Sequence, residues 1–230
     1  MNRTDVDWPG DGPLERPEAP GAVERWVAEL ARRAEQGAAA LVPRVAEEAH
    51  RRGLVELAYG FAHSPFGPLL VAVSRRGLVR VAYPDRDVDR ELERLAREVS
   101  PRIVESARAT DAVRRELEEY FEGRRRRFEV RPDLSLVRGF SRRVLEATAR
   151  VPFGTLATYR EVAGRAGSPG GYRAAGNALG SNPVPIVVPC HRVVRTGGDL
   201  GGYTGGVERK LALLRLEGVQ VPAPRRRPRG

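Results

Sequence analysis

The sequence predicts an α+β fold in which a small N-terminal α/β domain precedes a helical C-terminal domain that carries a helix-turn-helix. Two patterns support this prediction. In the first half of the chain, two apolar runs flank a short Arg-Gly turn, which is the signature of a β-hairpin. In the second half, short amphipathic segments are joined by a Gly- and Pro-rich turn, which is typical of a helix-turn-helix. The 230 residues are enough for two small domains.

The N-terminal residues divide into two segments. Residues 1–21 are rich in proline, glycine and acidic residues, so we expect a disordered leader. Apolar residues then recur at helical spacing, at Val23, Trp26, Val27 and Leu30 and again at Leu41, Val42, Val45 and Ala49. This spacing predicts a helical N-terminal extension over 22–53 that packs on the next domain.

The N-terminal α/β domain is expected over residues 54–132. Its β-hairpin consists of the apolar runs 69–73 and 78–83, which flank the turn at 75–77. Amphipathic helices are expected over 87–99 and 111–121, and Gly123 ends the second of them. A hairpin followed by helices in this order predicts an α+β domain.

The C-terminal domain is expected over residues 137–219. Three helices are predicted over 141–150, 158–166 and 172–180, and the last two are separated by the tight turn 167–171. The apolar run 184–188 predicts a strand that ends just before a Pro-Cys-His-Arg sequence at 189–192. A Gly-rich loop over 197–206 then leads into a last helix over 207–217, and residues 220–230 are expected to form a basic, disordered tail.

The composition favours a polyanionic partner. The net charge is +10 and the isoelectric point is about 10.7, which points to nucleic acid before other partners. The basic run 124–127 is compatible with a DNA contact and equally with a solvated loop. The N-terminus lacks the basic and apolar segments of a secretory signal, and no apolar run reaches the roughly 18 residues of a membrane span. We therefore expect a cytoplasmic protein with no membrane partner.

Cys190 is the only cysteine in the chain. This count excludes a disulfide within the chain and a cysteine-rich zinc site, and the three histidines are far apart in the sequence, so no metal site is expected. A lone cysteine is most often a small buried apolar residue. A histidine directly after it, however, can take its proton and generate a reactive thiolate. A cysteine hydrolase is one interpretation of this Cys-His pair.

The residues around the cysteine, PVPIVVPCHRVV at 183–194, closely resemble the active-site signature of the O6-alkylguanine-DNA alkyltransferase family, the methylated-DNA–protein-cysteine methyltransferases. Other segments match further motifs of that family: VPFG at 151–154, TY at 158–159, RAAGNAL at 173–179, NP at 182–183, GYTGG at 202–206, and LL with EG between 213 and 218. The resemblance is strong over 137–219 and weaker over 58–130, and residues 1–50 have no counterpart in compact members. It implies a ribonuclease H-like N-terminal domain and a C-terminal domain with a winged-helix or helix-turn-helix motif.

The resemblance assigns the catalytic roles. Cys190 would be the nucleophile that attacks the alkyl carbon. His191 would deprotonate it through a water molecule, with Glu217 orienting the histidine. Asn182 would hold the turn between the recognition helix and the active-site segment. Without the resemblance, Glu217 would be interpreted as a solvated acid at a helix end and Asn182 as an ordinary turn residue.

The resemblance also assigns residues that bind the base. The leaving guanine is anionic, so it needs hydrogen-bond donors, and Tyr203 and Thr204 lie where the family supplies them. Tyr159 would donate toward the base or crowd the target phosphate, although a buried tyrosine is more often a core residue. The backbone carbonyls of Cys190 and Val193 would contact the guanine amino group, and Pro185 would form an apolar wall.

A third group of residues is implied to bind DNA. Arg173 would fill the space left by the flipped base, and its alternative role is a phosphate contact. Ala174, Asn177 and Leu179 lie on the same predicted helix, which the family places in the minor groove. Small side chains let that helix approach closely and offer few donors for sequence-specific contacts. Asn177 and Leu179 depart from the small residue and the methionine that are common at these positions.

The resemblance implies direct-reversal DNA repair. The expected reaction is irreversible transfer of an alkyl group from O6-alkylguanine in double-stranded DNA to Cys190, with base flipping and one turnover per molecule; O4-alkylthymine is a further candidate substrate. No cofactor and no obligate protein partner are expected, and the protein is expected to be a monomer. The alternatives are a non-catalytic alkyltransferase-like lesion-binding protein and a helix-turn-helix regulator. The intact Cys190 disfavours the first, and the small residues of the third helix disfavour the second.

Overall fold

A computed structural model describes residues 55–83, 85 and 87–220 of the chain. The predicted leader at 1–21, the helical extension at 22–53 and all of the basic tail except Gln220 lie outside these described residues. Within them, no helix is both long enough and apolar enough to cross a membrane.

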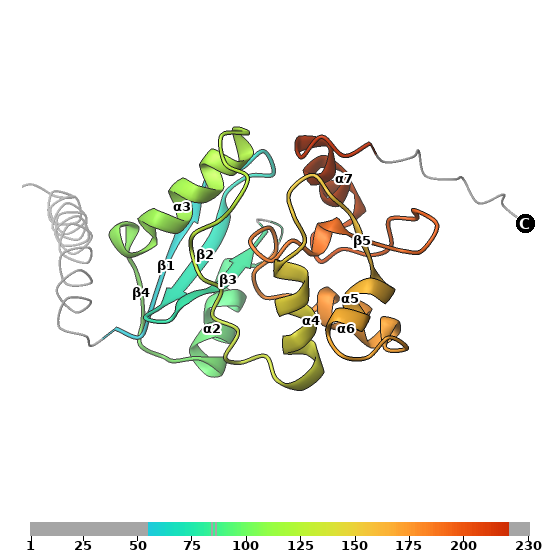
Figure 1. The fold of residues 1–230 in the computed structure, drawn as a ribbon. Helices are drawn as coiled ribbons and strands as arrows, with labels where there is room; N and C mark the ends of the chain where they lie inside the picture. The colour runs from blue at the N-terminus through green and yellow to red at the C-terminus, as the bar shows by residue number, and fades with distance from the viewer. Residues whose placement is uncertain (1–54, 84, 86, 221–230) are drawn as a thin grey trace, which may run out of the picture. The chain divides into compact units, whose positions relative to one another are not determined.

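The N-terminal part contains a four-stranded sheet. Its strands are β1 (Leu57–Ala62), β2 (Leu69–Ser74), β3 (Gly77–Ala82) and β4 (Ile103–Glu105), in the order β3-β2-β1-β4. The predicted hairpin is confirmed as the antiparallel pair β2 and β3, whereas the short β4 runs parallel to β1 (Figure 1). The sequence did not predict β1 and β4, because β1 contains alanine and glycine, which have low strand propensity, and β4 has only three residues.

Two helices cover the sheet. α2 (Val88–Glu98) is capped by Asp87, and its residue Leu95 packs with Leu70 and Val79 on one face of the sheet. α3 (Ala107–Phe121) contacts β1 and β2, and it starts four residues before the predicted position, because the side chain of Ser106 caps it by accepting from the Ala109 amide.

The C-terminal part is mainly helical. Its helices are α4 (Gly139–Ala149), α5 (Tyr159–Arg165), α6 (Tyr172–Gly180) and α7 (Val207–Leu216), each within two residues of the predicted bounds. Two short strands, β5 (Ala157–Thr158) and β6 (Val193–Val194), pair in parallel beside α5. The α5–turn–α6 unit confirms the predicted helix-turn-helix (Figure 1), and Thr158 with Glu161 forms a capping box that fixes the start of α5.

The prediction of a strand over 184–188 is wrong. The segment forms consecutive turns, with one isolated bridge between Pro185 and Val188, and Cys190 then begins the 3-10 helix η1 (Cys190–Arg192). Prolines at 183, 185 and 189 lack the amide that a strand would donate, and Ile186 has a φ of 75°, outside the β region. The segment is apolar because it is buried in the core.

The two parts share one hydrophobic core. A single cluster of buried side chains includes Leu69 and Val71 from the sheet, Leu117 from α3, and Ile186 and Leu213 from the C-terminal part. The backbone also crosses between them, since the Val81 amide donates to the Pro183 carbonyl at 2.9 Å. The segment that leads to the cysteine is therefore held against the N-terminal sheet.

Candidate active site

The Cys190 thiol is buried and hydrogen-bonded. Only 4% of the residue is exposed. The side-chain amide of Asn182 donates to its Sγ at 3.1 Å and also to the Val188 carbonyl at 2.9 Å, while its Oδ1 accepts from the Val184 amide. Burial raises the pKa of Cys190 to about 11, although the Asn182 hydrogen bond opposes the shift. The thiol is therefore protonated at neutral pH, and it needs a base before it can act as a nucleophile.

His191 has the properties of that base. Its ring is completely buried, and burial lowers its pKa below the usual 6.5, so it is neutral at pH 7. Nε2 lies 2.8 Å from Oε1 of Glu217, whereas Nδ1 is buried and has no hydrogen-bond partner in the described part of the chain. Glu217 is ionised and can only accept, so Nε2 must carry the hydrogen and Nδ1 must hold the free lone pair.

Glu217 caps the C-terminus of α7, and five hydrogen bonds hold its carboxylate. Besides His191, the donors are the Arg192 guanidinium (2.9 Å to each oxygen), the Tyr120 hydroxyl (2.7 Å) and the Gly154 amide (3.2 Å). Although burial opposes ionisation, the bonds from His191 and Arg192 lower the pKa of Glu217 to about 2. A carboxylate with this many fixed donors holds the histidine in one orientation.

The thiol lies in the wall of a cavity of about 780 Å³. Five of the predicted site residues besides Cys190 line the same cavity: Tyr159, Arg173, Leu179, Tyr203 and Thr204. The structure therefore brings together the predicted nucleophile, two residues of the predicted base-binding loop and part of α6. Within the described residues, no group of three His, Cys, Asp or Glu side chains could hold a metal ion.

Two predicted base-binding residues lie elsewhere. Pro185 is buried and lines a separate cavity of about 250 Å³, which shares Thr204 with the larger one. Val193 is fully buried in β6, and its carbonyl accepts a hydrogen bond from Lys210 Nζ at 2.5 Å. Neither residue lines the larger cavity, so both roles stay predictions.

The loop that contains Tyr203 and Thr204 is hydrogen-bonded to α5, to α6 and to the residue that follows β3. The Tyr159 hydroxyl donates to the Gly202 carbonyl at 3.3 Å, and the Thr204 hydroxyl reaches the Leu179 and Gly180 carbonyls at the end of α6. Tyr203 forms a 2.7 Å hydroxyl–hydroxyl contact with Tyr83, which follows β3.

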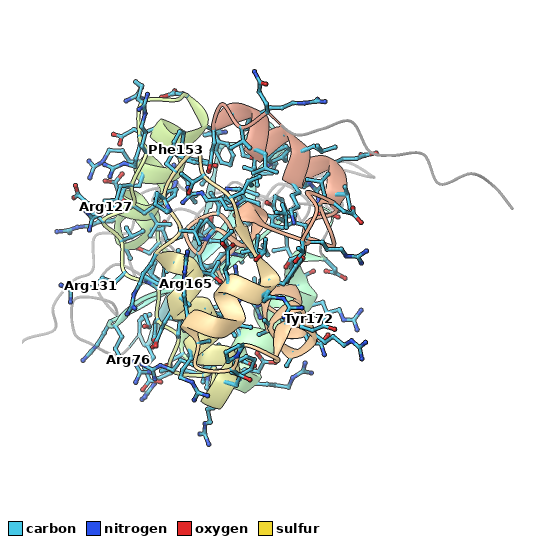
Figure 2. The ribbon with its side chains drawn as sticks, turned by 45° about the vertical axis from the view of Figure 1, so that its right-hand side comes forward. Arg76, Arg127, Arg131, Phe153, Arg165 and Tyr172 are labelled. Carbon is cyan, nitrogen blue, oxygen red and sulfur yellow. The ribbon has the colours of Figure 1, made fainter. Side chains whose placement is uncertain are left out.

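The predicted DNA-binding residues lie on α6. Arg173, Ala174 and Asn177 are exposed, whereas Leu179 is buried and forms part of the cavity wall. The exposed ring of Tyr172, at the start of α6, lies within cation–π distance of both Arg160 (5.5 Å) and Arg173 (5.8 Å) (Figure 2).

Further arginines give the surface its positive charge. Arg76, Arg127, Arg131 and Arg165 are exposed, and Figure 2 shows the first three on the side of the view opposite to Tyr172. In the predicted basic run 124–127, Arg125 forms an ion pair with Glu119, and Arg126 lies over the ring of Phe153. These contacts leave the two side chains less free to contact DNA.

Sequence reasoning missed four residues that support the site. Arg192 and Tyr120 hold Glu217, Tyr83 holds Tyr203, and Lys210 holds the backbone carbonyls of Val193, Leu200 and Gly202. Burial lowers the pKa of Lys210 to about 8. One signal was available, because Lys210 is the only lysine in a chain that otherwise uses arginine.

Family comparisons match both parts of the chain. The model described as the ribonuclease-like domain of 6-O-methylguanine DNA methyltransferase matches residues 57–134, and the model of its DNA binding domain matches residues 139–219.

Named relatives agree with these matches. A methylated-DNA–protein-cysteine methyltransferase of Methanosarcina barkeri is 34% identical over 69% of this chain and 96% of its own length. One from Mycobacterium tuberculosis is 46% identical over 47% of this chain, and this match spans 65% of the relative, just under two thirds.

Solved structures are similar as well. The crystal structure of Mycobacterium tuberculosis O6-methylguanine methyltransferase is 35% identical with a TM-score of 0.60, over 73% of this chain and 96% of that one. A structure described as Mycobacterium tuberculosis OGT in complex with DNA gives 34% identity and a TM-score of 0.59, over 72% and 96% of the two chains.

Proposed function

Because the chain belongs to the 6-O-methylguanine DNA methyltransferase family, we propose that it is a methylated-DNA–protein-cysteine methyltransferase that repairs DNA by direct reversal. Its substrate is O6-alkylguanine in double-stranded DNA, and its acceptor is Cys190. The observation that carries this proposal is the arrangement of the thiol in the cavity wall, next in sequence to a neutral histidine that Glu217 holds in one tautomer.

The reaction starts with proton transfer. The Cys190 proton passes through a water molecule to Nδ1 of His191, which is the nitrogen with the free lone pair. The thiolate then attacks the alkyl carbon, the carbon–O6 bond breaks, and its electron pair stays on the guanine. The proton that left the thiol ends on the guanine, so the products are a thioether and an unmodified base.

The thioether product requires no cofactor and allows no second turnover. A thioether, unlike a thioester, is not hydrolysed, and Cys190 is the only thiol in the chain. Each molecule therefore repairs one lesion.

The base is held by the residues around the cavity. Tyr203 donates to the guanine, Thr204 donates to it by turning its hydroxyl away from the Leu179 and Gly180 carbonyls, and Tyr159 borders it. The Val193 carbonyl and the Pro185 ring, which do not line this cavity, complete the contacts. The support for the first three is that they line the same cavity as Cys190.

DNA binds along α6. The flipped base enters the cavity from the minor groove, and Arg173 fills the space that it leaves in the duplex. Ala174 and Asn177 are exposed on the same helix and face the groove, while Leu179 shapes the cavity. The protein acts as a monomer in the cytoplasm.

Peptide mass mapping tests the proposal. After incubation with a duplex containing O6-methylguanine, the peptide with Cys190 gains the mass of one CH₂ group. The matched variant Cys190→Ser keeps its affinity for the lesion duplex and gains nothing, because a serine hydroxyl is far less acidic than a thiol. Binding without an adduct in the wild-type protein would instead indicate a lesion-binding protein or a helix-turn-helix regulator.

A further inference from the structure

Tyr83 brings a hydroxyl from the N-terminal sheet into the site. It directly follows β3, it is 4% exposed, and its hydroxyl oxygen lies 2.7 Å from that of Tyr203. The two rings meet edge to face with centroids 6.2 Å apart. Tyr203 in turn lines the cavity that contains Cys190, so Tyr83 lies directly behind a residue that would touch the base.

The ring of Tyr83 is fixed by the loop and helix that follow Tyr203. A side chain at Gly205 would meet the ring, because its Cβ would lie 2.5 Å from Cε2 of Tyr83. The Arg209 guanidinium lies 4.5 Å from the ring centroid and also donates to Asp85 at 2.9 Å. The Tyr83 ring is therefore held by packing against Gly205 and Arg209 in addition to its contact with Tyr203.

Each hydroxyl has one proton to give. Burial raises the pKa of both Tyr83 and Tyr203, so both are protonated at neutral pH. Among the described residues, neither hydroxyl has another hydrogen-bond partner. If Tyr203 donated to Tyr83, it would have no proton left for the substrate. If Tyr83 donates to Tyr203, the Tyr203 proton is free to point into the cavity.

We propose that Tyr83 is a positioning residue that donates to Tyr203 and thereby directs the Tyr203 proton toward the leaving guanine. This inference rests on the proposed function, which makes Tyr203 a donor to the base. In the order Tyr83 to Tyr203 to base, both hydroxyl protons are donated once the base is bound, and the Tyr203 oxygen also accepts. A hydrogen bond received by a hydroxyl also strengthens the one it gives, and this matters most as negative charge develops on the base.

Single-turnover rates on a duplex with O6-methylguanine test the proposal in wild type, Tyr83→Phe, Tyr203→Phe and the double variant. Tyr83→Phe keeps the ring, so the packing against Gly205 and Arg209 remains. We expect it to slow transfer about 2- to 12-fold, the range for loss of one hydrogen bond. The double variant should be no slower than Tyr203→Phe alone, because Tyr83 acts only through Tyr203.

Tyr59→Phe is the matched control. It removes a tyrosine hydroxyl from the same sheet, on β1, where the hydroxyl contacts Glu105 and lies outside the active site. Its rate should equal that of the wild type. All rates are taken from the time constant of adduct formation at Cys190, so a fraction of unfolded protein changes the amplitude and leaves the rate unaffected.

Substrate analogues distinguish this role from a structural one. The 3-deaza and 7-deaza forms of O6-methylguanine each replace one ring acceptor nitrogen with a C–H group. With each analogue, Tyr83→Phe should slow transfer only where Tyr203→Phe also slows it. If the nitrogen that the analogue lacks is the one that accepts from Tyr203, neither variant should slow transfer.

Each other result has a distinct meaning. A wild-type rate for Tyr83→Phe, or effects that multiply in the double variant, would overturn the inference and leave the proposed function intact. So would slowing by Tyr83→Phe with an analogue on which Tyr203→Phe has no effect. A wild-type rate for Tyr203→Phe would overturn the inference together with the donor role of Tyr203, and would leave alkyl transfer to Cys190 intact. Absence of transfer by the wild-type protein would overturn the proposed function itself.

Discussion

At the scale of single residues, the hydrogen bond from Nε2 of His191 to the Glu217 carboxylate determines which ring nitrogen of His191 can accept a proton. Arg192, Tyr120 and the Gly154 amide occupy the carboxylate from other sides, so the histidine can only donate through Nε2. This arrangement leaves Nδ1, which has no hydrogen-bond partner among the described residues, as the nitrogen that could take up the proton in the proposed reaction.

Removing the His191 ring or the Glu217 carboxylate should lower the rate of alkyl transfer much more than the affinity for DNA. His191→Ala and Glu217→Gln should lower the single-turnover rate by about 10²- to 10⁴-fold, the usual contribution of general-base catalysis. Affinity for the lesion duplex should change little, since neither side chain is exposed to DNA. An equal loss of affinity and rate, measured by binding titration beside rapid quench, would show that both residues are only structural.

Acid should destabilise the fold through the same pair. The pKa of His191 is lower in the folded protein than in the unfolded chain, where it is about 6.5. Its contribution to the free energy of unfolding is therefore lost as the pH falls below 6.5. Glu217 has a pKa of about 2 when folded and 4.5 when unfolded, so its contribution is present above 4.5 and is lost as the pH falls toward 2. The free energy of unfolding should therefore decline from pH 6.5 downward, and less steeply below pH 4.5 in Glu217→Gln. A flat profile from pH 7 to pH 3 would contradict the assigned protonation states.

The site residues that the sequence predicted are those that lie in motifs of the family it resembles. Cys190, His191 and Asn182 fall within one short motif. Tyr120 and Tyr83 do not, because their partners Glu217 and Tyr203 are 97 and 120 residues away. No local pattern indicates which of two buried tyrosines donates to an active-site group and which only packs.

At the scale of elements, α6 was predicted with its observed bounds, whereas the segment before Cys190 was assigned the wrong structure. The run 172–180 has helical spacing and follows a turn, so it has a local signal. The run 184–188 is apolar without a period, and an apolar run alone does not distinguish a strand from a buried turn. Its turns are instead specified by Asn182, whose side chain bonds the Val184 amide and the Val188 carbonyl.

Asn182 should accordingly be important for stability as well as rate. Asn182→Ala leaves the buried Val184 amide and Val188 carbonyl without these bonds, so we expect a loss of about 1–3 kcal/mol in the free energy of unfolding. Asn182→Asp keeps the acceptor for Val184 and removes the donor to Val188 and Cys190. Chemical denaturation of both variants should show a loss in each, and wild-type stability in Asn182→Ala would contradict this role.

The exposed start of α6 should affect only reactions that require base flipping. Arg173→Ala should weaken binding to the lesion duplex and slow transfer from it, because the flipped state loses the residue that fills the gap. Transfer from a free O6-benzylguanine-type base, if the cavity accepts one, should be nearly unchanged. Equal slowing with the free base would place Arg173 in the chemistry instead.

At the scale of the whole molecule, the N-terminal sheet takes part in the site. It shares a core with the C-terminal helices, and Tyr83, which directly follows β3, contacts Tyr203. The helix α3, which packs on the sheet, adds Tyr120, whose hydroxyl donates to Glu217. The order of the elements was sufficient to predict an α+β fold with a helix-turn-helix. How the sheet and the helices contact each other was not predictable, since that depends on pairs of buried residues far apart in the chain.

The central claim is that Cys190 keeps the alkyl group, and stoichiometry tests it most directly. A fixed amount of protein is mixed with a large excess of duplex containing O6-methylguanine, and repaired guanine is measured over time. Repair should rise once and then stop at about one guanine per active molecule, with alkylated Cys190 accumulating in equal amount. Continued repair beyond that plateau, or repair without an adduct on Cys190, would contradict the mechanism.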